Sequence, residues 1–305
     1  MKNRLTVCAS HLITLPSAPH GPVRGAIGTA REAVAAFDPE LVVFFGTDHR
    51  RAFRAVVPTF AVVLAATAQG DVAGPVGTYD VPSDLGRALV ANLVAHDFDI
   101  ATAYEAALDH AFGHTTRDLL GAIDARPVLP VFINCASPPH ASFRRAASLG
   151  RRVGEFFADK RVLYVGSGGL AHDLPGFREP ETGVVLTEEE RQAWIKSVNE
   201  RARSEGTIRE LVRTWDEAFL AGVGGTSWDW LDEIGTDLVE RGGNGAAECL
   251  TWTAAWAAGG EALTTLAHEF DTNGRAVVMS ARQALDVSAQ ENRMIRALPH
   301  CRTNE

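Results

Sequence analysis

Four histidines follow stretches that have the composition of buried strands. Each stands shortly after such a run: His11 after 5–9, His49 after 41–46, His110 after 99–104 and His172 after 161–166. The imidazole ring is the commonest metal ligand among side chains and can also take up or release a proton near neutral pH. In open α/β sheets, functional side chains collect beyond the carboxyl ends of parallel strands. The sequence therefore predicts one site for metal binding and proton transfer.

A metal site built on histidines also needs an anionic ligand, and Glu248 is the candidate. It lies at the start of the apolar segment 246–266, which we predict to be one helix buried on most sides. An acid in a first helical turn also stabilises the helix dipole by up to ~1 kcal/mol, so this position alone does not decide between the two roles. Two neutral imidazoles and one carboxylate form the facial triad of non-haem iron(II) oxygenases, which would leave two histidines for proton transfer.

The elements that must position these side chains alternate between strand and helix in the first half of the chain. Strands are predicted at 5–9, 41–46, 60–64, 99–104, 127–134 and 161–166, and helices at 26–37, 83–96, 110–120 and 143–157. Loops rich in proline or glycine are predicted at 16–22, 70–82 and 178–186. This alternation predicts an α/β fold with a central, largely parallel or mixed sheet flanked by helices.

Beyond Pro175 the pattern becomes mainly helical. Helices are predicted from 187 to about 220, around 228–234 and over 246–266. No internal repeat or independent linker interrupts the chain. We therefore expect a single domain over 1–305, with an α/β part (1–175) that carries the four histidines and a helical C-terminal portion (176–305) that carries Glu248.

Composition excludes several classes of partner. The 305 residues are 46% hydrophobic, which is enough for one large core. A net charge of −9 gives nucleic acid no long-range attraction, and no run approaches the ~20 apolar residues of a membrane span. The four cysteines have no Cys-x-x-Cys spacing, so a reducing cytoplasm is the expected location. Ser10 and His11 interrupt the N-terminal apolar run, which favours a first strand and its loop over a signal peptide.

The histidine motifs and their neighbours also occur in a characteristic order. The pieces are Ser10–His11, Asp48–His49, Asp109–Phe112, Pro127–Asn134, Gly166–His172 and Glu248–Trp252. In order and approximate spacing they resemble those of the class III extradiol ring-cleaving dioxygenases. The likeness is dense over 5–175, returns near 215–216 and 246–256, and fades after 265. The segment Gly166–His172, joined to the other histidine motifs, makes it highly specific.

This resemblance implies an enzyme that uses Fe²⁺ to insert both atoms of O2 into a catechol-type substrate. It implies that His11, His49 and Glu248 hold the metal and that His110 and His172 are the acid/base pair. One histidine would remove a proton from the catechol, and the other would donate a proton as the ring opens to a muconic semialdehyde-type product. The implied substrate is a 3-substituted catechol such as 2,3-dihydroxyphenylpropionate, and the implied assembly is a homo-oligomer.

Some cationic residues depart from the pattern of that family. Arg50 and Arg51 follow His49, where they form either a solvated basic turn or a contact to a substrate carboxylate. His114 lies one helical turn after His110. We expect a surface residue here, with a third group for substrate contact or proton transfer as the alternative.

Four further residues next to the motifs bear on the site. Asp48 and Asp109 each precede a key histidine, so each is a candidate for orienting an imidazole ring. Neighbours in sequence often point apart, which leaves the alternative that neither does so. Cys135 and His140 make the loop after 127–134 different from that of the family, so the substrate pocket is expected to differ there.

Three other functions fit part of the pattern. A catalytically inactive binding protein on the same scaffold would not need both the metal ligands and the acid/base histidines. A phosphate-binding loop at 166–169 would lack the full Gly-x-Gly-x-x-Gly spacing. A metal-dependent hydrolase, for example one that uses zinc, would take the same ligand types. Oxygen uptake with a catechol separates the dioxygenase from all three.

Overall fold

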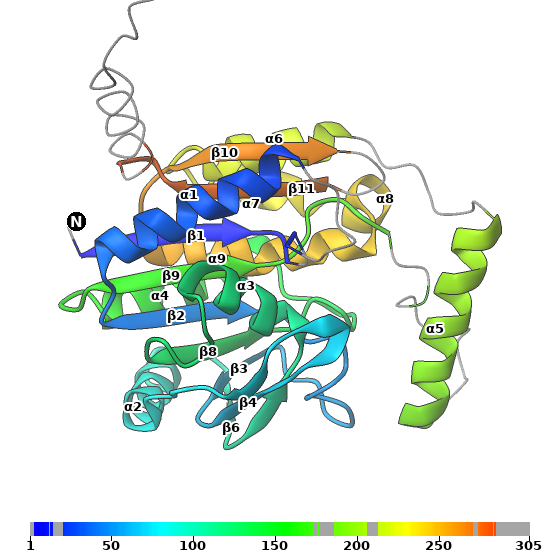
Figure 1. Cartoon of the computed structure of the whole chain (residues 1–305), viewed down its shortest axis with the longest axis horizontal. Helices are drawn as coiled ribbons and strands as arrows, with labels where there is room; N and C mark the ends of the chain where they lie inside the picture. The colour runs from blue at the N-terminus through cyan, green and yellow to red at the C-terminus, as the bar shows by residue number, and fades with distance from the viewer. Residues whose placement is uncertain are drawn as a thin grey trace, which may run out of the picture.

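An eight-stranded mixed sheet forms the centre of the molecule (Figure 1). The computed structural model describes residues 3–11, 13–14, 21–173, 176, 186–205, 213–270, 274–282 and 284. In sheet order the strands are β10 (Leu263–Phe270), β11 (Gly274–Ser280), β1 (Arg4–Ala9), β9 (Val162–Ser167), β2 (Leu41–Gly46), β8 (Val128–Ile133), β3 (Phe60–Val63) and β6 (Ala101–Ala103). The central strands β1, β9, β2 and β8 run parallel, and antiparallel pairs lie toward both edges. The predicted α/β fold with a mixed sheet is confirmed.

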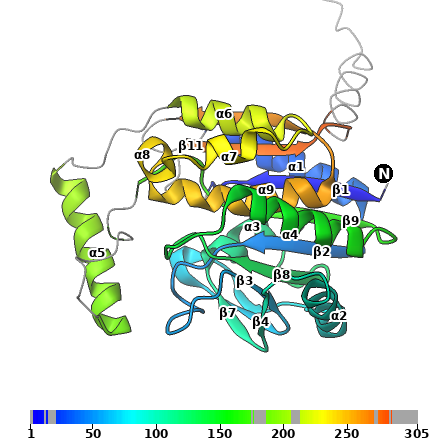
Figure 2. The same ribbon diagram turned by 180° about the vertical axis from the view of Figure 1, so that it is seen from behind.

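Strand β2 shows why the central strands are continuously apolar. All six of its residues are buried, because helices cover both faces of the sheet. Val43 and Phe45 belong to the core shared with α4 (Phe143–Phe156) and α9 (Cys249–Gly259). Val42 and Phe44, which alternate with them, belong to the core shared with α1 (Pro22–Phe37) and α3 (His110–Leu120). The two helical layers are seen from opposite sides in Figures 1 and 2.

Two glycines let α4 and α9 pack with their backbones in contact. An added Cβ at Gly150 would lie 2.0 Å from the carbonyl oxygen of Ala254, and one at Gly154 would lie 2.3 Å from that of Ala258. Only hydrogen can occupy these positions, so the two helices approach more closely than side chains would allow. Helix α9 also contacts β1, β2 and β9, so its N-terminus is fixed beside the carboxyl ends of these strands.

The apolar segment 246–266 is not one helix, so that prediction was wrong. A 3₁₀ turn, η3 (Asn244–Glu248), precedes α9, and α9 ends at Gly259. Gly260 ends it in the left-handed conformation (φ 71°), and the chain enters β10 at Leu263. Glu248 is consequently the residue just before α9 rather than a member of the first turn of a longer helix. The strand pair β10–β11 was not predicted.

The predicted loop 70–82 contains regular structure, and a further strand lies between the predicted strand 99–104, which contains β6, and His110. A second, three-stranded sheet has the order β5 (Val76–Thr78), β4 (Ala66–Gln69) and β7 (Ala106–Leu108). A 3₁₀ turn, η1 (Asp71–Ala73), joins β4 to β5. His110 therefore follows β7 of this small sheet, not a strand of the large one.

The other helices are α2 (Ser83–Val94), α5 (Glu188–Glu205), α6 (Arg213–Val223), α7 (Trp230–Ile234) and α8 (Leu238–Gly242). Helix α5 stands apart from the sheet and its two helical layers (Figure 1). The predicted helix 187–220 is represented by α5 and α6, and residues 206–212 between them lie outside the described residues. So do 16–20 and 178–185, which belong to two of the predicted loops. None of the helices in the described part of the chain has the length and apolar character needed to cross a membrane.

A glycine-to-alanine substitution should destabilise the protein within the contact between α4 and α9 and stabilise it at an open helix position. Gly150→Ala should lower the free energy of unfolding by about 1 to 3 kcal/mol, because the new methyl group meets the Ala254 backbone. Gly28→Ala in α1 is the matched control, since no atom lies within 4 Å of its Cβ position. It should raise the free energy of unfolding by up to about 1 kcal/mol. Urea unfolding measures both, and a Gly150→Ala protein as stable as the parent would contradict the packing.

Candidate active site

Three of the predicted histidines lie with their rings in contact. The ring centroid of His11 is 5.4 Å from that of His49 and 5.3 Å from that of His110. The rings of His49 and His110 are stacked, with centroids 4.4 Å apart and an interplanar angle of 16°. The residues come from three elements, since His11 follows β1, His49 follows β2 and His110 opens α3. The structure brings them together as the sequence predicts.

Glu248 joins this group and connects it to the fourth histidine. Its Oε1 lies 3.2 Å from Nε2 of His49 and 3.8 Å from Nε2 of His172, and its Oε2 lies 3.9 Å from Nε2 of His11. The carboxylate also accepts a hydrogen bond from the backbone N–H of Gly169. Three of the predicted histidines therefore face one carboxylate, and the remaining one, His110, contacts the rings of His11 and His49.

The electrostatics of this group suit metal binding. Burial would raise the pKa of the Glu248 carboxyl, but the positive charges that His11 and His172 carry at low pH and the hydrogen bond of His49 hold it well below its usual range. Burial lowers the pKa of His11 to about 3 despite the neighbouring Glu248 carboxylate. At neutral pH Glu248 and His11 therefore have the forms that bind a metal ion. Burial alone would lower the pKa of His49, but the Asp109 and Glu248 carboxylates raise it well above its usual value, so metal binding to His49 would displace a proton.

The described residues contain more than one set of three potential ligands. Ring nitrogens of His11, His49 and His110 lie within 4.8 Å of one another, and so do ligand atoms of Asp71, Asp109 and His110. Glu248 contacts both His11 and His49. A divalent ion bound by imidazoles favours a carboxylate that neutralises part of its charge, and Glu248 is the buried anion that faces both rings. Its carboxylate is therefore better suited than the His110 imidazole to complete the ligand set.

His11 provides an independent test of whether a metal ion fits here. Among the described residues its Nδ1 is buried and has no hydrogen-bond partner, and its Nε2 lies 3.9 Å from Glu248, too far for a hydrogen bond. A buried polar atom without a partner costs about 1 to 3 kcal/mol, so native proteins rarely retain one. A metal ion bound at Nδ1 would remove this cost, and one bound at Nε2 would lie beside the Glu248 carboxylate, so the donor set fits a metal site.

Asp109 orients His49 from behind. Its Oδ2 accepts hydrogen bonds from the backbone N–H of His49 and from Nδ1 of the same residue, both at 2.8 Å. Its Oδ1 accepts from the backbone N–H of Ala111, so the same side chain caps α3. Burial would raise the pKa of Asp109, but the charge and hydrogen bonds of His49 hold it far below its usual range. Asp109 thus fixes the His49 tautomer with Nε2 toward Glu248.

Asp48 has a different task from Asp109. Its carboxylate accepts hydrogen bonds from the backbone N–H groups of Arg51, Ala52 and Phe53. Burial and the neighbouring Asp109 raise its pKa to about 6. The side chain therefore ties down the turn that follows His49 and is not aimed at the imidazole.

His172 is held by the loop that follows β9. Its Nδ1 lies 2.8 Å from the carbonyl oxygen of Leu170, which makes Nδ1 the protonated nitrogen and leaves Nε2 toward Glu248. The backbone of the same loop is fixed by the fully buried Asp216 of α6, whose Oδ1 accepts from the N–H of Ala171 at 2.8 Å. Asp216 also lies 3.1 Å from Nε2 of His268 on β10. The sequence did not predict this anchor.

The tentative substrate-binding residues have different surroundings. Arg50 adopts a left-handed backbone conformation (φ 61°), and its guanidinium donates to the Ser137 hydroxyl at 3.2 Å and to the Arg54 carbonyl at 2.8 Å. Arg51 is half-buried in the same turn. His114 is fully buried, so the expectation of a surface residue was wrong. Its Nδ1 accepts from Arg117 and its Nε2 donates to the Val72 carbonyl at 3.1 Å, and burial lowers its pKa.

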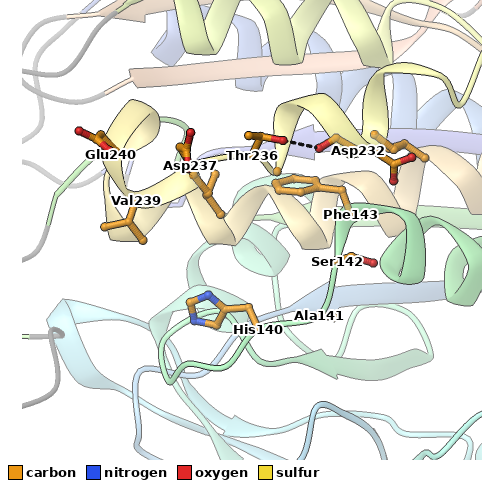
Figure 3. A pocket seen from close by; sticks show the side chains of 12 residues that line it. His140, Ala141, Ser142, Phe143, Asp232, Thr236, Asp237, Val239 and Glu240 are labelled. Carbon is orange, nitrogen blue, oxygen red and sulfur yellow. Dashed lines mark hydrogen bonds between the residues drawn. The ribbon is translucent and has the colours of Figure 1, made fainter. Parts of the chain in front are cut away.

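A cavity of about 670 Å³ lies beside the loop that follows β8 (Figure 3). His140 and Phe143 line one side, and Asp237 and Glu240 from the segment between α7 and the end of α8 line the other. None of the predicted metal or acid/base residues lines it. Cys135, at the start of the same loop, is fully buried, and its pKa is raised by burial and by the Glu248 carboxylate.

Comparison with known families decides the class of this site. The family described as the catalytic LigB subunit of aromatic ring-opening dioxygenase matches residues 7–279. The chain belongs to the LigB family. The match includes His11, His49, His110, His172 and Glu248.

Curated relatives of this LigB chain carry the name 2,3-dihydroxyphenylpropionate/2,3-dihydroxicinnamic acid 1,2-dioxygenase. The protein of that name from Mycolicibacterium vanbaalenii is 38% identical over 285 residues, which cover 82% of this chain and 87% of the relative. The one from Cupriavidus necator is 38% identical over 250 residues, which cover 75% and 79%. The family and these names make the chain a ring-cleaving extradiol dioxygenase, as the sequence predicts.

A solved structure agrees with this LigB chain in fold alone. It is the crystal structure of an uncharacterized protein from Escherichia coli K12, with a TM-score of 0.56 and 14% identity. The alignment covers 91% of this chain and 99% of the other.

The link between Asp109 and His49 predicts a loss of metal affinity. Asp109→Ala removes the acceptor of two His49 hydrogen bonds, so the affinity for Fe²⁺ or Co²⁺ should fall about 10- to 100-fold in an anaerobic titration. Ser142→Ala is the matched control, because Ser142 caps α4 through the Arg145 N–H. Each loss of a cap should cost about 1 kcal/mol of stability. Equal metal affinities in the two variants would show that Asp109 acts only as a cap.

Proposed function

We propose that this dioxygenase depends on iron(II) and cleaves a 3-substituted catechol of the 2,3-dihydroxyphenylpropionate type. The observation that carries the proposal is the convergence of His11, His49 and His172 on the buried Glu248 carboxylate. Two imidazoles and one carboxylate form the ligand set of non-haem iron(II) oxygenases. The names of the curated relatives support the substrate class.

In this proposal His11, His49 and Glu248 hold the iron. When bound, the ion would bring catechol and O2 together and allow their reaction, which is otherwise slow. Asp109 keeps Nε2 of His49 directed toward the site by accepting the proton of Nδ1. The strands β1 and β2 carry two of the ligands, so their separation is fixed by the sheet itself.

His110 and His172 are proposed to move protons. Nδ1 of His110 is hydrogen-bonded to Asp71 at 2.7 Å, and Nδ1 of His172 is hydrogen-bonded to the Leu170 carbonyl at 2.8 Å. The free edge of each ring can therefore take a proton from a catechol hydroxyl or return one to the ring-opening product. The two histidines come from different elements, α3 and the loop after β9, so they can serve different atoms of one substrate.

Arg50 is the proposed contact for the substrate carboxylate. The chain carries a net charge of −9, so an anionic substrate needs a local cation. Arg50 directly follows the ligand His49, and its guanidinium is held at Ser137 on the loop after β8. A guanidinium can bind a carboxylate through two parallel hydrogen bonds.

We also propose a cytoplasmic location and a homo-oligomer. Cys8, Cys135 and Cys249 are buried free thiols, which suits a reducing compartment. Size-exclusion chromatography with light scattering tests the assembly, and a monomeric mass would refute it.

The proposed roles of Glu248 and His172 predict two distinct defects. Glu248→Ala should lose bound iron and all turnover, because it removes the anionic ligand. His172→Ala should keep iron and bind catechol but lose about 100-fold or more in kcat, because it removes a proton-transfer group. Anaerobic iron loading, followed by O2 and 2,3-dihydroxyphenylpropionate, measures iron content, oxygen uptake and the yellow ring-opened product. An iron-replete, active Glu248→Ala protein, or no uptake by the parent with any catechol, would overturn the proposal.

The proposed role of Arg50 predicts a change in substrate preference. Arg50→Gln should raise KM for 2,3-dihydroxyphenylpropionate about 10- to 100-fold, because one charge-assisted contact to the carboxylate is lost. KM for 3-propylcatechol, which has the same carbon chain without the carboxylate, should stay unchanged. Arg51→Gln is the matched control from the same turn. If Arg51→Gln alone shows the selective effect, the carboxylate contact belongs to Arg51.

A further inference from the structure

Asp71 is a partly buried acid outside every motif identified in the sequence. It begins η1, the 3₁₀ turn of the small sheet, and its Oδ2 lies 2.7 Å from Nδ1 of His110. The two side chains are only 14% and 11% exposed, so water competes little with this hydrogen bond. The other oxygen, Oδ1, is buried and has no hydrogen-bond partner among the residues that the structure describes. The carboxylate is therefore directed at His110 and does not cap its own turn.

The turn that carries Asp71 has an unfavourable backbone. Val72 and Ala73 have φ angles of 51° and 55°, in the left-handed region that residues with a Cβ rarely adopt. Such a conformation costs of order 1 kcal/mol for each residue and persists only when its surroundings enforce it. The buried His114 supplies one restraint, because its Nε2 donates to the carbonyl oxygen of Val72 at 3.1 Å.

The stacked rings determine which edge of His110 faces the site. Nδ1 of His49 and Nδ1 of His110 lie 2.8 Å and 3.9 Å from the same oxygen of Asp109. The two rings are stacked, and Nδ1 of His110 is held on the side of Asp71 and Asp109, so its Nε2 lies on the side of the ring away from these acids. Nε2 of His49 is 3.2 Å from Glu248. Nε2 of His110 is therefore the ring nitrogen available for proton transfer.

We propose that Asp71 is a positioning residue for His110, and that His114 holds Asp71 in place through the strained turn. Asp71 accepts the Nδ1 proton, which fixes the tautomer with an unprotonated Nε2 toward the site. Without Asp71 the ring can rotate or take the other tautomer, and Nε2 then carries the proton or points away. The catalytic consequence rests on the proposed proton-transfer role of His110, whereas the effect on the tautomer does not.

Two substitutions separate positioning from simple structural support. Asp71→Ala removes the acceptor, whereas Asp71→Asn keeps a carbonyl oxygen that can accept the Nδ1 proton. With iron bound, kcat should fall about 10- to 100-fold in Asp71→Ala, because a misoriented His110 loses part of the rate gain that a general acid or base provides. In Asp71→Asn kcat should return to nearly the parent value. KM and iron content should stay at parent values. Asp80→Ala, at an exposed aspartate of the same segment, is the control and should be unchanged.

A second readout does not depend on turnover. Proteins with ¹⁵N-labelled histidine and bound Zn²⁺ report the tautomer of each imidazole by NMR, and His110→Gln identifies the signals of His110. The parent and Asp71→Asn should show the Nδ1–H tautomer, and Asp71→Ala should lose it. An unchanged tautomer in Asp71→Ala would overturn the proposal, as would an equal fall in kcat and iron content. Failure of the parent to cleave any catechol would instead refute the proposed function, while the NMR result would still test Asp71.

The contribution of His114 is tested by a double-mutant cycle. If His114 acts only by holding the turn of Asp71, the double variant Asp71→Ala/His114→Ala should lose no more kcat than Asp71→Ala alone. His114→Ala should show a smaller loss than Asp71→Ala and a mixture of His110 tautomers. Multiplicative losses in the double variant would show that His114 acts independently and would overturn this part of the proposal.

Discussion

The site depends on one carboxylate, that of Glu248, being held away from water among three imidazoles. Removing an ionised carboxylate from water costs several kcal/mol unless charges and hydrogen bonds replace the lost hydration. Here His49 and the Gly169 N–H supply the hydrogen bonds, and His11 and His172 lie within 4 Å. The close packing of α9 on α4 holds the backbone at Glu248 in place, so the core of the protein fixes the anion around which the histidines gather.

The histidines in turn are oriented by a second set of acids. Asp109 binds His49, Asp71 binds His110, and Asp216 fixes the backbone next to His172. Each acid comes from a different part of the chain than the histidine that it contacts or supports. The geometry of the site therefore depends on tertiary structure rather than on any local motif, and small errors in packing would be transmitted to the rings.

The sequence predicted the parts of this arrangement that leave a local signal. Continuous apolar runs such as 41–46 predicted the central strands, and the histidines after them were placed at one site. The end of α9 was missed because Gly259 and Gly260 are followed by further apolar residues, which belong to β10. His114 was expected on the surface, since helical spacing gives the face of a helix but not what covers it. Asp71 was missed because Gly70–Asp71 is typical of an ordinary turn and its partner lies 39 positions away.

The small sheet β5-β4-β7 continues from the edge of the large one, because β4 follows β3 and β7 follows β6 after two residues each, and the N–H groups of Leu64 and Ala106 bond across the junction. The large sheet carries His11 and His49, whereas His110 and Asp71 follow strands of the small one. Asp109 also follows β7, so the small sheet positions both the proposed proton-transfer residue His110 and the acid that orients His49. A shift at the junction of the two sheets would therefore alter proton delivery and ligand orientation together.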